Sequence, residues 1–152
     1  MFANLLIGTV MIVINLTIQV LAVALLIRYF TKRIDTGQLA QSLFNDTKTL
    51  SVVMAVLMIG HAFMFATGAA LLVWLGEFED FATAFYHSTV NFTSLGYGDI
   101  VMSEERRLLG ALEAANGVLM FGLSASAVLS VMNALFQRRG AFSALKGKPA
   151  RD

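Results

Sequence analysis

Residues 93–99 read Thr-Ser-Leu-Gly-Tyr-Gly-Asp. This stretch ends a short apolar segment, residues 81–95, that is too short to cross a hydrocarbon core as a helix. Non-helical backbone at membrane depth survives only when it is buried in protein or lines water. Gly96 and Gly98 can adopt backbone angles that side chains forbid elsewhere. The stretch therefore predicts a re-entrant segment that ends in a specialised loop.

Three longer apolar segments accompany the loop. Residues 1–27 carry no charge, residues 50–75 are interrupted only by His61, and residues 108–136 contain Glu113. About 20 apolar residues suffice for a membrane-spanning helix, so each segment predicts one span. A cleaved signal peptide is the rival interpretation of the first, but the basic start and a clear cleavage site are lacking. The expected order is span, span, half-span, span.

The composition excludes several classes of function. Charged residues make up 14% of the chain, against about 25% in a typical soluble domain. Cysteine is absent, so neither a disulfide framework nor a thiolate metal site is expected. We find no catalytic Ser-His-Asp grouping, and His61 and His87 alone make no metal site. We expect a protein that is not an enzyme, has no cofactor and binds no nucleic acid.

The charges predict an orientation. Basic residues are in excess after the first and third segments, whereas acidic residues dominate the connection that holds the Gly-rich loop. Positive charge concentrates on the cytoplasmic side of membrane proteins. We therefore expect the N-terminus and the loop outside and the C-terminus in the cytoplasm. The basic residues beyond the third span could contact anionic lipid, although a plain disordered tail is the alternative. They are Arg138, Arg139, Lys146, Lys148 and Arg151.

The run from Thr93 to Asp99 resembles the signature of potassium channels, in which Thr-Val-Gly-Tyr-Gly is followed by Asp. The resemblance covers residues 50–136, the two-helix pore module, and bacterial members of this type imply a location in the bacterial inner (plasma) membrane. Backbone carbonyls in such a loop replace the hydration shell of K⁺. Four loops surround each ion, so the resemblance implies a homotetramer. The filter residues it implies are Ser94, Leu95, Gly96, Tyr97 and Gly98, with K⁺ held at the first four; serine and leucine replace the usual threonine and valine.

The same resemblance implies the residues that support the filter. Thr93 and His87 belong to the pore helix and Asp99 to an acidic outer mouth, while Val90 stands where some bacterial members carry a glutamate. We hypothesise that Glu113 packs behind the filter and accepts hydrogen bonds from the pore helix. Its candidate donors are His87, Ser88, Thr89 and Asn91. The alternative, weighed about evenly, is a solvated carboxylate paired with Arg106 or Arg107.

Other positions leave their roles open. Gly117 and Gly122 are candidates for a gating hinge, because inner helices of the family often bend at a glycine there. Asn15 and Gln19 are four residues apart and share a helix face, so they could bond to a neighbouring helix. His61 is either a hydrogen-bonded core residue or a pH-sensitive contact with the third span. No arginine-repeat helix is present, so intrinsic voltage sensing is not expected.

The fold class expected is an all-α membrane protein, with three transmembrane helices, a re-entrant pore helix and a filter loop in a tetrameric channel. We divide the chain into an additional N-terminal helix (1–30), a cytoplasmic linker or interfacial helix (31–48), the pore module (49–136) and a basic cytoplasmic tail (137–152). The function expected is passive, selective K⁺ conduction. The alternatives are a weakly selective cation channel and a non-conducting membrane subunit; a proton-coupled transporter ranks low, because no internal repeat is visible.

Overall fold

The computed structural model describes residues 1–36 and 42–146, with side chains up to residue 140. Within these ranges it contains four helices and no strand: α1 (Phe2–Asp35), α2 (Leu43–Trp74), α3 (Phe81–Phe92) and α4 (Arg107–Lys146). Three of them, α1, α2 and α4, are long and apolar enough to cross a membrane. The all-α membrane architecture and the order of three spans with one short helix are confirmed.

The helix ends differ from the sequence boundaries. α1 continues to Asp35 and α2 begins at Leu43, so the described part of the expected 31–48 linker extends the two spans. Ser42 caps α2 by accepting a hydrogen bond of 3.2 Å from the Asn45 amide. α4 continues to Lys146, ten residues beyond the expected end of the pore module. Residues 37–41 and 147–152, which belong to the predicted linker and tail, lie outside the described residues.

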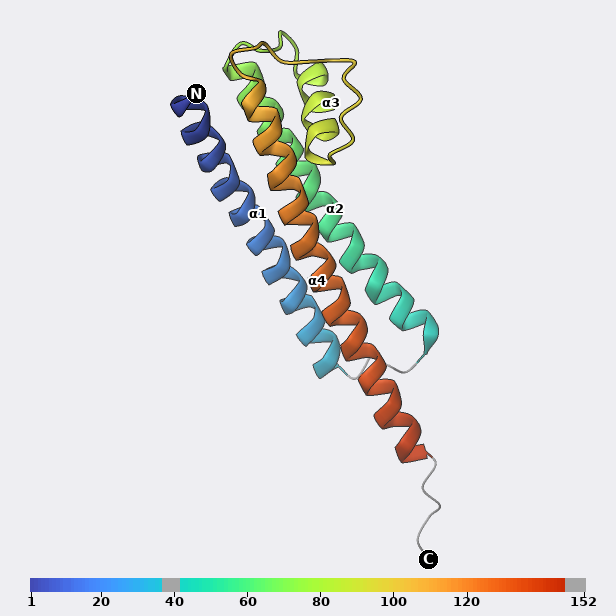
Figure 1. Cartoon of the computed structure of the whole chain (residues 1–152). Helices are drawn as coiled ribbons and strands as arrows, with labels where there is room; N and C mark the ends of the chain where they lie inside the picture. Colours follow the sequence, from blue (N-terminus) through green and yellow to red (C-terminus); the bar gives the residue numbers. More distant parts are fainter. Residues whose placement is uncertain (37–41, 147–152) are drawn as a thin grey trace, which may run out of the picture.

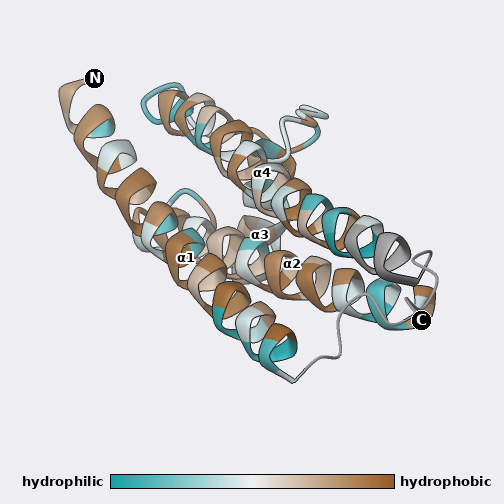
Figure 2. Cartoon of the chain, turned by 90° about the horizontal axis from the view of Figure 1, so that it is seen from below, coloured by the Kyte–Doolittle hydropathy of each residue, from teal (hydrophilic) through white to brown (hydrophobic). Residues whose placement is uncertain are grey.

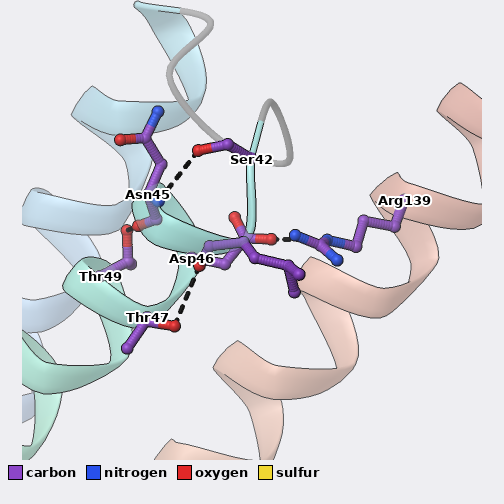
Figure 3. Close-up of polar contacts among 7 residues, drawn as sticks. Ser42, Asn45, Asp46, Thr47, Thr49 and Arg139 are labelled. Atoms are coloured by element: carbon purple, nitrogen blue, oxygen red, sulfur yellow. Dashed lines mark hydrogen bonds and ion pairs between the residues drawn. The ribbon is translucent and has the colours of Figure 1, made fainter.

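The long helices alternate in direction along the bundle (Figure 1). At one end the Asn4 side chain donates to the Glu105 carbonyl over 2.7 Å, which ties the start of α1 to the loop before α4. At the other end Arg139 Nε of α4 lies 2.7 Å from Asp46 Oδ2 near the start of α2 (Figure 3). The N-terminus and the Gly-rich loop therefore share one end, as the charge pattern predicts.

Helix α1 buries a mostly polar and small face and exposes its apolar residues. Much of the α1 ribbon is brown in Figure 2, the colour of hydrophobic residues, and exposed apolar residues are suited to lipid. Thr67 Oγ1 of α2 donates to Asn15 Oδ1 over 3.2 Å, and Gln19 Nε2 donates to Ser124 Oγ of α4 over 2.8 Å. The expected bonds from this face to neighbouring helices are thus confirmed. The buried residues of α1 are Asn4, Gly8, Asn15, Gln19, Ala22 and Leu26.

The short helix α3 occupies one end of the bundle and is anchored at both of its termini. Asp80 caps its start, because Asp80 Oδ1 accepts a hydrogen bond of 2.8 Å from the Thr83 amide. Its last residue, Phe92, is fully buried and packs with Met64 and Phe65 of α2 and Met120 of α4. The chain then turns back towards the same end (Figure 1). This packing fixes the point from which the Gly-rich loop begins.

Candidate functional site

The backbone of the Gly-rich loop alternates in handedness. Ser94, Gly96 and Gly98 have φ values of 58°, 57° and 74°, whereas Leu95 and Tyr97 do not enter the positive-φ region. This alternating sign of φ occurs in neither a regular helix nor a strand. Glycine tolerates such angles, but a serine there costs about 1–3 kcal/mol, a kind of strain that is concentrated at functional sites.

The end of α3 holds the start of the loop through backbone amides. The Ser94 amide donates to the Asn91 carbonyl over 2.8 Å, and the Leu95 and Gly96 amides donate to the Val90 carbonyl over 3.0 and 3.4 Å. Thr93 Oγ1 donates to the Thr89 carbonyl over 2.8 Å. The N–H groups of residues 94–96 are therefore directed towards α3, which leaves their carbonyl oxygens free to serve another ligand.

Two side chains of α3 hold the far end of the loop. The Tyr86 hydroxyl donates to Asp99 Oδ2 over 2.7 Å, and this bond holds the pKa of Asp99 below its usual value. His87 Nδ1 lies 3.1 Å from the Ile100 carbonyl, and His87 Nε2 lies 2.8 Å from Asn91 Nδ2. The amide of Asn91 must donate to Nε2, so Nδ1 carries the proton that it donates to Ile100. The loop is thus tied to α3 at both ends.

Glu113 of α4 lies against the rear of α3. Ser88 Oγ donates to Glu113 Oε1 over 2.5 Å, and Asn91 also hydrogen-bonds this carboxylate. Gly68 of α2 provides the space for this contact, because a Cβ there would overlap both Glu113 Oε1 and Ser88 Oγ. Of the two alternatives, the geometry matches packing against the pore helix. A role of this contact in supporting the filter stays a prediction.

Glu77 makes several contacts between loops, and the sequence did not predict them. Its carboxylate accepts hydrogen bonds from the Ser103 amide and hydroxyl, at 2.9 and 2.8 Å. Its Oε1 lies 3.2 Å from Arg106 Nε, so Arg106 is paired here and not with Glu113. These contacts join the loop after α2 to the loop before α4. A separation of 26 residues between Glu77 and Ser103 left no local pattern that could have revealed them.

The two hinge candidates have different surroundings. A Cβ on Gly117 would overlap the Phe92 carbonyl oxygen, so this glycine allows α4 to approach the end of α3. Nothing lies within 4 Å of a Cβ built on Gly122. Gly117 therefore has a packing role that sequence reasoning did not identify. Gly122 has no such constraint, and a hinge function stays a prediction for both.

Residues 93–99 are exposed in the isolated chain. The side chains of Leu95 and Tyr97 remain 54% and 68% accessible. Across the described ranges, no group of three or more acidic or histidine side chains could hold a metal ion.

Comparison with known proteins gives one match. The model of a family described as "Ion channel" matches residues 51–134, which is more than half of the chain. The match includes most of α2, all of α3, the Gly-rich loop and most of α4. It excludes α1. No curated protein and no solved structure matches the chain.

Proposed function

The chain belongs to the ion channel family, and on this premise we propose that it is a homotetrameric, potassium-selective channel. K⁺ would cross the membrane passively through a filter formed by Ser94, Leu95, Gly96, Tyr97 and Gly98. A filter must replace the hydration shell of the ion with oxygens at fixed positions. The single observation that carries the proposal is the alternation of positive φ at residues 94, 96 and 98.

The direction of the amide groups adds to this support. Three consecutive N–H groups donate to the carbonyls at the end of α3. Their own carbonyls can then face a common axis. The hydroxyl of Ser94 would stand at the inner entrance of the filter, and Asp99 would hold negative charge at the outer entrance, where it attracts cations. Thr93, His87 and Glu113 would support this loop from α3 and α4.

The exposure of the loop favours assembly. One loop supplies one quarter of a ring, and four copies with closed cyclic symmetry complete it. Polar backbone at membrane depth has to be buried in protein or to line water. Apolar Leu95, polar backbone and an accessible Tyr97 lie together on the isolated chain. Neighbouring copies would cover all of them at once.

The location and the lipid partner follow from the same proposal. The protein would lie in the bacterial inner membrane with the filter outside and the C-terminus in the cytoplasm. The basic residues after α4 would contact anionic lipid there. The weakly selective cation channel and the non-conducting subunit are the rival functions, and both are resolved by the same assay.

The test is ion flux through the purified chain in lipid vesicles. K⁺-loaded vesicles should take up a cationic dye or tracer rapidly, and Na⁺-loaded vesicles should not. Gly96→Ala should abolish the K⁺ flux, because alanine is strained at φ 57° although no atom lies within 4 Å of the added Cβ. Gly140→Ala is the matched control, since it also has open space but lies in α4. Equal K⁺ and Na⁺ fluxes would indicate weak selectivity, and no flux from the unmodified chain would reject conduction.

A further inference from the structure

A small cavity lies where α1, α2 and α4 meet, next to the carboxylate that contacts α3. Its volume is about 30 Å³, and its wall includes Asn15 of α1, Gly68 of α2, and Glu113 and Asn116 of α4. A water molecule needs about 10–15 Å³ of such space and two to four polar partners. The cavity is therefore large enough for at least one water molecule, and three of its lining side chains are polar.

The polar groups around the cavity have unused hydrogen-bonding capacity. Asn15 and Asn116 are each 2% exposed. Within the described ranges, Asn116 Oδ1 is buried and accepts no hydrogen bond. The carboxylate of Glu113 has two oxygens and room for more donors than Ser88 and Asn91 provide. At this depth there is no bulk water to satisfy such groups, so leaving them unpaired is costly.

We propose that this cavity binds one water molecule that connects α1 to Glu113. The two O–H groups of the water donate to Asn116 Oδ1 and to the Glu113 carboxylate. The amide group of Asn15, whose Oδ1 accepts from Thr67 Oγ1, donates to the water oxygen. Each of the three polar side chains thereby gains a partner, and the water makes three hydrogen bonds, the usual number for a buried one.

The site gives a function to α1, the helix that lies outside the region matched by the family model. Through the water, α1 is connected to Glu113, and Glu113 accepts the bond from Ser88 of α3. In this way α1 supports the pore helix indirectly, through the water molecule and Glu113. This consequence for ion currents rests on the proposed channel function, whereas the water site itself does not.

The site can be tested without any current. In lipid vesicles, the full chain labelled with ¹⁵N-asparagine should show magnetisation transfer from water to the side-chain amides of Asn15 and Asn116 in proton-detected solid-state NMR. Asn116→Leu should abolish the transfer at Asn15, and Asn133→Leu, at an exposed position of α4, should preserve it. If both amides of the unmodified protein lack the transfer, the cavity is dry and the proposal is wrong, whether or not the variants fold.

The connection to the filter has its own measurement. Asn15→Leu and Asn116→Leu should each change the time constant of current decay by roughly 2- to 10-fold, the range that one lost hydrogen bond allows. Because both remove the same water, the double variant should match the larger single effect. Effects that multiply would overturn the shared water. Thr17→Val is the control, since Thr17 is exposed and bonds only its own helix at Val13. An unmodified protein that passes no current would reject the channel, while the NMR result would still decide the water site.

Discussion

Ser94 is the residue at which this loop departs most clearly from ordinary backbone. A non-glycine residue with φ of 58° is strained, and the strain persists only where the surroundings fix the conformation. Here the Ser94 amide is held by the Asn91 carbonyl at 2.8 Å. The hydroxyl that replaces the family's threonine is therefore placed by the backbone of α3. Leu95 stands where the family signature has valine, and no contact of its side chain in the described chain explains this difference.

The bond from Tyr86 to Asp99 predicts a pH effect. Because this bond lowers the pKa of Asp99, the carboxylate stays ionised at pH values at which an ordinary aspartate begins to be protonated. Tyr86→Phe should raise that pKa towards its ordinary value, so the attraction for cations at the mouth should be lost at a higher pH. The measurement is single-channel conductance against external pH. Tyr29→Phe, at the opposite end of the bundle, should leave the midpoint unchanged, and an unchanged midpoint in Tyr86→Phe would contradict the assignment.

Glu113 predicts a difference between two substitutions. Glu113→Ala leaves the buried Ser88 hydroxyl without its acceptor, which should lower the free energy of unfolding by about 1–3 kcal/mol. Glu113→Gln keeps an acceptor oxygen and should cost less. Thermal unfolding of the purified protein measures both, and Glu104→Ala, at an exposed position, is the control. If alanine and glutamine both behave like the unmodified protein, Glu113 does not brace α3.

At the scale of elements, the contact between α3 and α4 depends on a glycine. The Phe92 carbonyl belongs to the last turn of α3, and a Cβ on Gly117 would overlap it. Backbone at the end of a packed helix cannot move aside as a flexible side chain can. The close approach of α4 to the end of α3 therefore depends on one missing methyl group.

Gly117→Ala and Gly122→Ala should therefore differ. The first should lower the free energy of unfolding by about 1–3 kcal/mol or more, as overpacking does. The second should leave it unchanged or raise it by up to about 1 kcal/mol, because alanine favours helix more than glycine. Calorimetry or thermal unfolding of both variants is the measurement. Equal losses in the two would contradict the packing role of Gly117.

At the scale of the whole molecule, the sequence predicted the elements well because membrane helices follow simple length and hydropathy rules. The three spans, the short α3 and the shared face of Asn15 and Gln19 could be expected. The contact of Glu113 with Ser88 was one of two alternatives that the sequence left open. The helix ends were harder to predict, because no proline or glycine occurs between Tyr29 and Asp35 or between Phe136 and Gly140. The ends of α1 and α4 accordingly lie beyond the predicted ones.

The contacts that could not be predicted join residues far apart in the chain. Glu77 with Ser103 and Arg106, and Tyr86 with Asp99, depend on how the loops at one end of the bundle come together. The packing role of Gly117 depends on the position of a backbone oxygen in another helix. A sequence pattern reports which residues share a face, but it does not report such distances.

The central claim is that the loop at residues 94–98 selects K⁺, and the reversal potential under bi-ionic conditions tests it most directly. With K⁺ on one side of a planar bilayer and Na⁺ on the other, a tenfold preference displaces the reversal potential by about 59 mV, the Nernst factor for one charge. Selective conduction through backbone carbonyls predicts a displacement larger than this in the direction that favours K⁺. A reversal potential near zero would contradict the claim.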